Sequence, residues 1–248
     1  MNGAFRVGGD DYDAFMGRYS TVLAPLFADF AGVGSGARAL DVGAGTGALT
    51  AELLARGASV AAADPSPEFA AVLRERFPEI EVREAPAEAL PFETGEFDVA
   101  LAQLVVAFMA DAPAAIAEMA RVARRVAVCM WGIQEVDMFA AIDRTAATIG
   151  PSPQAEPRRY RTPHELHDLL APHGEVESAA LDVTAGYRDF DEFWQAMDRG
   201  VGPAGQWLAS LDADARERAH EELFRQLGSP DGPFELGARA FAVAATRA

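Results

Sequence analysis

Residues 37–47 read ARALDVGAGTG, an apolar run followed by three glycines at alternate positions. Residues 37–42 have the length and apolar character of a short buried strand, and residues 48–56 continue as a helix closed by Gly57. Because glycine has no Cβ atom, such a turn lets the backbone approach a ligand, and a Cβ at Gly43 or Gly45 is expected to intrude on it. The stretch therefore predicts a strand–turn–helix unit that binds a ligand.

The alternation of strand and helix continues downstream of this unit. Strands are expected at residues 59–63, 79–84, 97–103 and 125–131, with helices at 65–77 and 112–123. Strands and helices that alternate with short turns predict a parallel sheet covered by helices on both faces. Because ligands of such sheets bind at the carboxyl ends of the strands, we expect functional residues at Asp41, Asp64, Gln103 and Trp131.

Two long strands and a helical insertion are expected in the second half of the chain. Residues 176–187 and 234–246 read as strands that pair antiparallel at one edge of the sheet. The segment from Thr162 to Glu165 is a capping box that begins a helix ahead of them. Residues 190–227 are expected to be helical, and an insertion of this size between two edge strands, at residues 188–230, is best explained as a lid over the strand ends.

The expected organisation is one α/β domain over residues 1–248. It comprises an N-terminal helical cap at residues 10–35, a ligand-binding core at 37–132 and the helical lid at 188–230. With half of its 248 residues hydrophobic, the chain can bury a core of this size. The apolar residues of the lid helices are suited either to covering the site or to pairing two chains as a homodimer, and the sequence leaves this choice open.

The composition favours a small-molecule partner. A formal net charge of -17 would repel phosphate backbones, so nucleic acid is not expected as a substrate. The single cysteine, Cys129, excludes a disulfide framework and a paired-cysteine zinc site, and no metal is expected. Residues 1–13 lack the pattern of a signal peptide, and the longest apolar run, residues 99–110, is too short to cross a membrane. We therefore expect a cytoplasmic protein with no membrane contact.

The spacing and charge of the glycine turn distinguish between cofactors. Dinucleotide folds usually show G-x-G-x-x-G, which places a helix N-terminus under a pyrophosphate. This turn instead reads G-x-G-x-G, with Asp41 two residues before the first glycine. A carboxylate beside a pyrophosphate is repulsive, whereas beside the ammonium and sulfonium groups of S-adenosylmethionine it is attractive. The charge favours the sulfonium cofactor.

Asp64 ends the second expected strand, where a carboxylate can accept hydrogen bonds from both hydroxyl groups of a ribose. Dinucleotides and S-adenosylmethionine both contain this ribose, so Asp64 supports a nucleoside site without choosing between them. The alternative role for Asp64 is N-cap of the helix that begins at Pro65. The glycine turn upstream favours the ribose role.

Four motifs resemble the small-molecule branch, methyltransferase type 11, of the class I S-adenosylmethionine-dependent methyltransferases. They are residues 40–49, Asp64-Pro65-Ser66, residues 87–92 (AEALPF) and residues 97–100 (FDVA), in the order and at about the spacing of that family. The match covers roughly residues 37–131. The resemblance implies a Rossmann-like, mostly parallel sheet of seven strands, with helices on both faces and one antiparallel strand at the edge.

The same resemblance implies which residues bind the cofactor. Gly43, Ala44, Gly45 and Gly47 would surround the methionine and ribose groups, Asp41 would lie near the methionine amino group, and Asp64 and Pro65 at the ribose. Ala87 and Glu88 would lie beside the adenine, and Gln103 against the methionine moiety and the substrate. Tyr12 and Tyr19 resemble an N-terminal motif of some relatives that closes over the cofactor, although packing within a cap helix explains them equally well.

One departure from the family concerns the adenine. Similar proteins often carry an aspartate just before the Ala-Glu pair, where it accepts a hydrogen bond from the exocyclic amine, and this chain has Pro86 there. Either the backbone near Ala87 contacts the adenine, or Glu88 does, or the affinity is reduced.

The expected function is methyl transfer from S-adenosylmethionine to an O, N or C atom of a small-molecule metabolite, with S-adenosylhomocysteine as product. Because the sulfonium is already activated, the expected mechanism is in-line displacement aided mainly by proximity, and no catalytic base is assigned. One alternative is an NAD(P)-dependent oxidoreductase, which the G-x-G-x-G spacing and the lack of any lysine for a Tyr-x-x-x-Lys pair disfavour. The other is a protein that binds the cofactor without catalysis.

Overall fold

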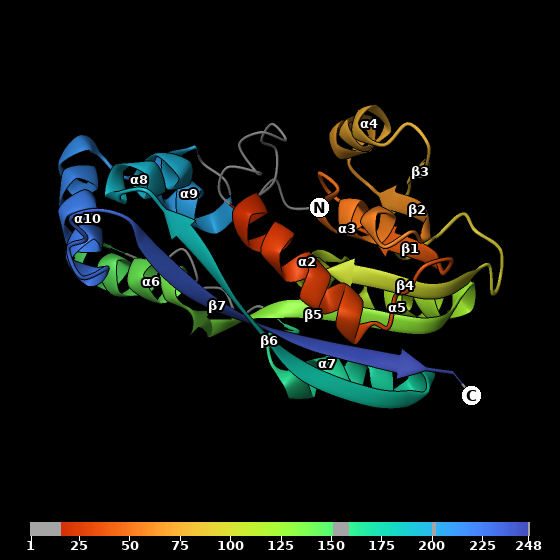
Figure 1. Cartoon of the computed structure of the whole chain (residues 1–248). Coiled ribbons are helices and arrows are strands. Elements are labelled where there is room, and N and C mark those ends of the chain that lie inside the picture. The colour runs from red at the N-terminus through yellow and green to blue at the C-terminus, as the bar shows by residue number, and fades with distance from the viewer. Residues whose placement is uncertain (1–15, 151–158, 200–201, 248) are drawn as a thin grey trace.

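The fold is described from a computed structural model that covers residues 16–150, 159–199 and 202–247. Within these residues seven strands form one sheet, in the order β3-β2-β1-β4-β5-β7-β6 (Figure 1). The strands are β1 (Arg38–Val42), β2 (Ser59–Asp64), β3 (Glu81–Glu84), β4 (Phe97–Gln103), β5 (Ala123–Val136), β6 (Glu175–Tyr187) and β7 (Phe234–Thr246). Neighbouring strands are parallel except at β7, which runs antiparallel to both β5 and β6.

The order of the strands reverses between β1 and β4. From β1 the chain builds outward through β2 to β3 at one edge, and from β4 it builds through β5 toward the other edge. In open α/β sheets, ligands bind outside the carboxyl ends of the strands at such a reversal. The topology therefore directs attention to the residues that follow β1 and β4.

Helices cover both faces of the sheet. They are α2 (Arg18–Phe30), α3 (Ala48–Ala55), α4 (Pro67–Arg76), α5 (Ala112–Val122), α6 (Asp137–Ile149), α7 (Pro163–Leu170), α8 (Phe190–Asp198), α9 (Gly202–Ser210) and α10 (Ala213–Gln226), with short 3-10 turns at Val106–Phe108 and Ala171–His173. One apolar layer joins the sheet to α2 and α3, and a second joins the opposite face to α5 and α7. The central strands are buried on both faces, which explains why β1 and β4 read as nearly continuous apolar runs.

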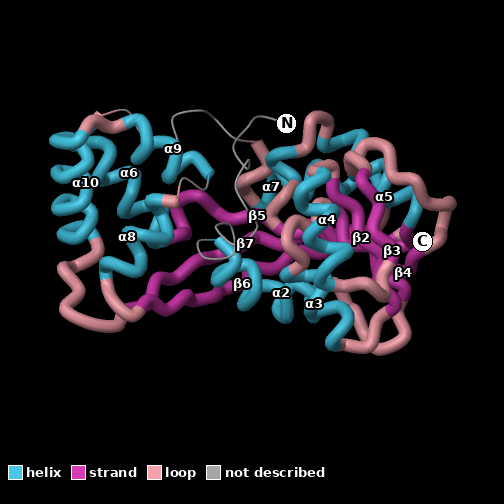
Figure 2. The backbone as a smooth tube through the Cα atoms, turned by 90° about the horizontal axis from the view of Figure 1, so that it is seen from above, coloured by secondary structure: helices cyan, strands magenta, loops and turns pink. Residues whose placement is uncertain are grey.

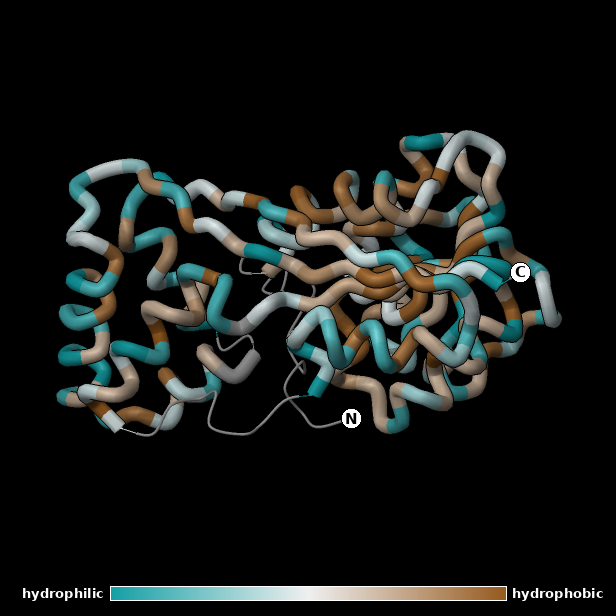
Figure 3. Tube along the Cα trace, turned by 90° about the horizontal axis from the view of Figure 1, so that it is seen from below, coloured by the Kyte–Doolittle hydropathy of each residue, from teal (hydrophilic) through white to brown (hydrophobic). Residues whose placement is uncertain are grey.

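Four helices gather at one end of the sheet and form what we call the helical lobe, comprising α6, α8, α9 and α10. Figures 1 and 2 show the lobe beyond the carboxyl end of β5, where the long strands β6 and β7 extend to meet it. The helix α10 packs against α6, and its outward face is mostly hydrophilic, as Figure 3 shows. The lobe therefore has its own apolar interior, which is continuous with the layer under α2.

The expected α/β architecture is confirmed. All seven strands are present within a few residues of their expected bounds, and the capping box at Thr162 is formed by both hydrogen bonds. The one antiparallel strand, β7, lies next to the edge strand β6 and pairs with both β5 and β6.

Two features differ from the sequence-based expectation. The strand β5 continues past Trp131 to Val136 through an irregular register, and α6 follows it where no helix was expected. The signal for α6 was present, because its buried residues Met138, Ala141, Ile142, Thr145 and Ala146 repeat at helical spacing. Part of the expected N-terminal cap, including Tyr12, lies outside the described residues.

Candidate functional site

The three glycines of the turn after β1 have positive φ angles, of 70° at Gly43, 57° at Gly45 and 93° at Gly47. A Cβ atom at Gly43 would lie 2.6 Å from the Val105 side chain, and one at Gly47 would overlap the ring of Phe77. A Cβ atom at Gly45 would meet nothing within 4 Å. Packing within the chain thus requires glycine at positions 43 and 47, whereas Gly45 faces open space among the described residues. The close approach of a ligand to Gly43 and Gly45 stays a prediction.

The chain leaves β4 in a strained conformation. Leu104 has a φ of 62°, in the left-handed region that a leucine rarely adopts, and its N–H donates to the carbonyl of Cys129 at 2.9 Å. This turn sets Val105 against Gly43. The segments that follow β1 and β4 are therefore packed directly on each other, and strain of this kind is common at functional sites.

Asp64 is buried at the end of β2 and faces the glycine turn. Its Oδ2 accepts a hydrogen bond from the Gly45 N–H at 2.9 Å, and its Oδ1 accepts one from the Ser66 N–H at 2.9 Å. Burial raises the pKa of the carboxyl group, and the two backbone donors oppose that rise. A carboxylate has about four lone-pair positions, so acceptor capacity remains for the hydroxyl groups of a ligand.

The alternative role for Asp64, as N-cap of the following helix, is wrong. Ser66 is the N-cap residue of α4, because its hydroxyl accepts from the Phe69 N–H at 3.3 Å. Pro67 occupies the first turn, and Pro65 lies in the link between Asp64 and the cap. The helix is therefore capped without Asp64, whose carboxylate is directed to the glycine turn instead.

Asp41 is buried at the end of β1, and its Oδ2 accepts a hydrogen bond from the Thr50 hydroxyl at 2.7 Å. Burial raises the pKa of this carboxyl group to about 7, with a smaller contribution from the charge of Asp64. Within the described residues neither Asp41 nor Asp64 forms a salt bridge. The glycine turn thus lies beside two buried carboxyl groups that lack a cationic partner, which suits a positively charged ligand.

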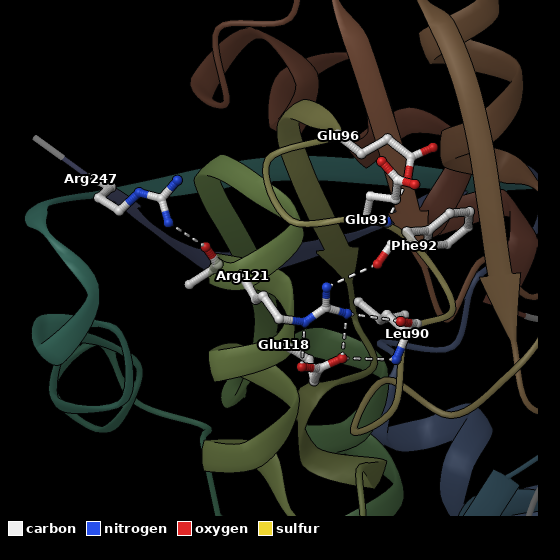
Figure 4. Close-up of polar contacts among 8 residues, drawn as sticks. Leu90, Phe92, Glu93, Glu96, Glu118, Arg121 and Arg247 are labelled. Carbon is white, nitrogen blue, oxygen red and sulfur yellow. Dashed lines mark hydrogen bonds and ion pairs between the residues drawn. The ribbon is translucent and has the colours of Figure 1, made fainter.

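The segment after β3 carries Ala87 and Glu88. Ala87 is buried, and the Glu88 carboxylate accepts from the Asp111 N–H at 3.0 Å, which ties this segment to the start of α5. Its far end is held by a clamp that Figure 4 shows: Glu118 accepts from the Leu90 N–H, and Arg121 donates to the carbonyls of Leu90 and Phe92. These contacts fix the segment beside the end of β2, where the Ala85 N–H donates to the Asp64 carbonyl.

Gln103 ends β4 and reaches the helix α2. Its Nε2 donates to the carbonyl of Ser20 at 3.0 Å, while its Oε1 is buried and has no hydrogen-bond partner. Tyr19, which precedes Ser20 in α2, is also buried. Its ring packs edge-on against the ring of Trp131, with the two ring centroids 6.2 Å apart. Tyr187 of β6 donates from its hydroxyl to that of Tyr19 at 3.3 Å. Burial raises the pKa of both tyrosines, so both phenols stay neutral.

The structure therefore brings together most of the expected site residues at the carboxyl ends of β1, β2 and β4. Tyr19 lies farther along, against Trp131 and Tyr187. Sequence reasoning did not predict a role for Thr50, Val105 or Tyr187, because the contacts that place them in the site form only in the folded chain. In the described part of the chain, no cluster of His, Cys, Asp and Glu residues could hold a metal ion, and no helix is long and apolar enough to span a membrane.

Part of the chain is similar to known proteins. A family model described as a methyltransferase domain matches residues 40–130, the stretch from β1 into β5. An uncharacterized protein of Mycobacterium tuberculosis (strain ATCC 25618 / H37Rv) is 38% identical over 119 residues, which cover 46% of this chain and 43% of that protein. The chain thus spans less than half the length of this curated relative.

Solved structures share the fold over most of the chain. A protein from Anabaena variabilis ATCC 29413, described as a "putative methyltransferase from antibiotic biosynthesis pathway", superposes with a TM-score of 0.63 at 19% identity, covering 89% of this chain and 96% of that one. The cyclase SpnF superposes with a TM-score of 0.55 at 18% identity, covering 92% and 81%. At such identities the similarity shows the fold alone, and the same fold carries more than one kind of reaction.

Proposed function

We propose that this chain, whose residues 40–130 match a family model described as a methyltransferase domain, is an S-adenosylmethionine-dependent methyltransferase that acts on a small molecule. The proposal covers the cofactor, the reaction and the class of acceptor. The atom that receives the methyl group, whether O, N or C, is left to experiment.

The observation that carries this proposal is the charge around the glycine turn. Asp41 and Asp64 are both buried and have no cationic partner among the described residues, and Gly45 between them faces open space. A sulfonium and an ammonium group would supply the missing positive charge, whereas a pyrophosphate would add to the repulsion. The residues present therefore fit S-adenosylmethionine better than a dinucleotide.

Each part of the cofactor has residues suited to it. Asp64 has acceptor capacity for the ribose hydroxyls. The clamped segment with Ala87 and Glu88 lies where the adenine would extend. On the other side of the turn, Gln103 Oε1 has no partner among the described residues and is an acceptor suited to the methionine moiety. Pro86 leaves the adenine amine without the aspartate seen in many relatives, so we assign adenine contacts to the clamped segment as a whole.

Methyl transfer requires little acid–base chemistry from the protein. The cofactor supplies an activated methyl group, and the protein has to align the acceptor atom and exclude water. We assign water exclusion to α2, which is fixed over β4 by the Gln103 bond to Ser20, and to the helical lobe beyond β5. In this proposal the lobe helices α8 to α10 act as the lid over the acceptor.

Two observations favour a small acceptor. The chain carries a formal net charge of -17, which disfavours nucleic acid. The helical lobe brings an aromatic interior, with Phe190, Phe193 and Trp207 buried, next to the carboxyl ends of the strands. An apolar lining with few polar groups is typical of small-molecule sites.

Isothermal titration calorimetry of the purified protein with S-adenosylmethionine, S-adenosylhomocysteine, NAD and NADP tests the proposal. We expect the two adenosyl sulfur compounds to bind with a Kd of about micromolar order, or about 8 kcal/mol, and the dinucleotides not to bind. Binding of NAD or NADP, or of none of the four, would refute the cofactor assignment. Binding without turnover of any acceptor would favour a cofactor-binding protein instead.

Substitution of Asp64 tests the ribose assignment. Asp64→Ala should weaken S-adenosylhomocysteine binding by about 1 to 3 kcal/mol, because charged hydrogen bonds to the ribose are lost. Asp98→Ala is the matched control, since Asp98 is an exposed aspartate at the start of β4, away from the carboxyl ends of the strands. Equal affinity of the wild type and Asp64→Ala would contradict the ribose role.

A further inference from the structure

Two buried hydrogen-bond donors lie near the point where β5 becomes irregular, and neither has an acceptor among the described residues. The first is Trp131 Nε1. The second belongs to a tyrosine pair: Tyr187 donates to Tyr19 at 3.3 Å, which leaves the proton of Tyr19 without an acceptor in the described part of the chain. If Tyr19 donated instead, the proton of Tyr187 would be left over. An unpaired buried polar group costs about 1 to 3 kcal/mol, so native proteins retain few of them.

The register of the sheet places these side chains on one face. Trp131 of β5 is level with Ala240 of β7, which is level with Leu181 of β6. Tyr187 lies an even number of residues beyond Leu181, so it projects from the same face as Trp131, because side chains alternate along a strand. The helix α2 covers this face and brings Tyr19 to both, edge-on to the Trp131 ring and within hydrogen-bond distance of the Tyr187 hydroxyl. We call these three residues, Tyr19, Trp131 and Tyr187, the donor cluster.

The donor cluster lies beyond the residues that we assign to the cofactor. The glycine turn follows β1, Gln103 ends β4, and Trp131 lies on β5, the next strand outward. Gln103 is level with Cys129, so Trp131 lies two residues farther toward the carboxyl end of β5. Past Trp131 the pairing of β5 with β7 becomes irregular and resumes at Val136, and irregularities of this kind are common beside active sites. A molecule held by the donor cluster would therefore lie on the lobe side of the cofactor, where the methyl acceptor is expected.

The donor cluster offers protons without a net charge. Burial raises the pKa of Tyr19 and Tyr187, so both phenols stay protonated, and an indole N–H only donates. The Arg18 guanidinium lies over the Tyr187 ring, but it is paired with Glu192 and donates to the Gly186 carbonyl. Uncharged donors suit the lone pairs of an uncharged oxygen atom, whereas an ammonium group has no lone pair to offer them.

We propose that Trp131 Nε1 and the Tyr19 hydroxyl both donate to one carbonyl oxygen of the methyl acceptor, so that the substrate is a carbonyl compound. This inference rests on the proposed function. A carbonyl oxygen has two lone pairs, which matches two donors that lack an acceptor among the described residues. Because lone pairs that are engaged by two donors are poor nucleophiles, this oxygen anchors the substrate, and the atom that is methylated is another atom of the same molecule.

The indole N–H signal of Trp131 in nuclear magnetic resonance spectra reports directly on this contact. The chain has three tryptophans, so a nitrogen-15-labelled sample gives three indole signals, which Trp194→Phe and Trp207→Phe assign by elimination. The probes are cyclohexanone, acetophenone and 2-acetylnaphthalene, each compared with the hydrocarbon that has CH2 in place of the carbonyl group: cyclohexane, ethylbenzene and 2-ethylnaphthalene. With S-adenosylhomocysteine present, the Trp131 signal should move downfield with at least one ketone and not with its hydrocarbon, because a new hydrogen bond deshields the proton.

Removal of either donor should weaken the binding of that ketone. Trp131→Phe and Tyr19→Phe should each raise its Kd about tenfold through the loss of one hydrogen bond, as measured from the signals of the ketone itself. Tyr160→Phe is the matched control, because Tyr160 packs on the opposite face of the sheet and should leave the Kd of the ketone unchanged. Circular dichroism checks that each variant is folded, and the Trp131 signal of the wild type does not depend on the variants.

Each outcome has a distinct meaning. If S-adenosylhomocysteine binds but no ketone moves the Trp131 signal, or if a hydrocarbon moves it as far as its ketone does, the carbonyl assignment is wrong while the proposed function stands. Equal ketone affinity of the wild type and of folded Trp131→Phe or Tyr19→Phe would overturn the assignment as well. If S-adenosylhomocysteine does not bind the wild type, the proposed function fails and this inference fails with it.

Discussion

The glycine-turn side of the site and the Gln103–Trp131 side are assembled in different ways. On the first side, the bonds from Thr50 to Asp41 and from Gly45 to Asp64 join residues only 9 and 19 positions apart. On the second, Gln103 bonds to Ser20 across 83 positions and Tyr187 to Tyr19 across 168. The nucleoside end of the ligand is thus assigned to a local unit, and the remainder to contacts that exist only in the folded chain.

The largest effect is expected within the glycine turn. Gly47→Ala should lower the free energy of unfolding by about 4 kcal/mol, because a Cβ there overlaps the Phe77 ring and the left-handed φ of 93° strains any other residue. Gly45→Ala is the matched variant: its Cβ meets open space, so we expect about 1 kcal/mol from the φ angle alone. Urea unfolding measures both values.

The same pair of variants separates folding from binding. Gly45→Ala should remain folded yet bind S-adenosylhomocysteine at least about tenfold more weakly, since the Cβ fills space that the ligand needs. Normal binding by Gly45→Ala would show that the ligand does not approach this glycine and would move the site away from the turn.

The next effect concerns Asp41 and depends on pH. The folded protein holds the pKa of Asp41 at about 7, above its ordinary value of 3.8, so the folded state binds more protons than the unfolded state between these values. The free energy of unfolding therefore falls as pH rises from about 4 to about 7, and the loss is complete above that range. Asp41→Asn removes this penalty and should raise the free energy of unfolding by about 4 kcal/mol at pH 8, with no gain below pH 4.

The Asp41→Asn substitution should raise the free energy of unfolding but lower the affinity for S-adenosylmethionine. Asp41→Asn should bind S-adenosylmethionine more weakly than the wild type, because the attraction between the carboxylate and the cationic groups is lost. Asp168→Asn serves as the control, since Asp168 is exposed on α7 and should leave both quantities unchanged. A stability gain that is the same at pH 4 and pH 8 would contradict the role of buried charge.

The smallest effect is expected on the long-range side. Tyr187→Phe removes the hydroxyl that donates to Tyr19 and should lower the free energy of unfolding by about 1 kcal/mol. A double-mutant cycle with Tyr19→Phe should show that the two changes are not additive, because both remove the same hydrogen bond. Full additivity would indicate that the two hydroxyls do not interact.

The elements around the glycine turn were also easier to predict from the sequence than those farther along the chain. The strands around the glycine turn were found within one or two residues, because buried parallel strands are apolar runs and the turn is marked by glycine. The helix α6 was missed although its apolar spacing is regular, and β5 was ended five residues early, at Trp131, where its register becomes irregular. No local pattern indicates that a strand continues through such an irregularity.

For individual residues, the sequence shows the residue type, whereas the folded chain shows the role. Glycine at positions 43, 45 and 47 is visible in the sequence, but only the folded chain shows that the first and last are required by Val105 and Phe77. The sequence also allows Asp64 to cap the following helix, and only the folded chain shows that Ser66 occupies that position.

Four features could be predicted from the amino-acid sequence alone: the α/β class, the glycine turn, the acid at the end of each of the first two strands and the resemblance to a methyltransferase family. These depend on side-chain type and spacing within short stretches, where backbone preferences act directly. The tertiary structure decided which polar atoms are satisfied and which stay unpaired, because burial and hydrogen bonding depend on segments distant in sequence. Among the described residues, the unpaired atoms of Gln103 and Trp131 are therefore apparent only once α2, β4 and β5 are packed together.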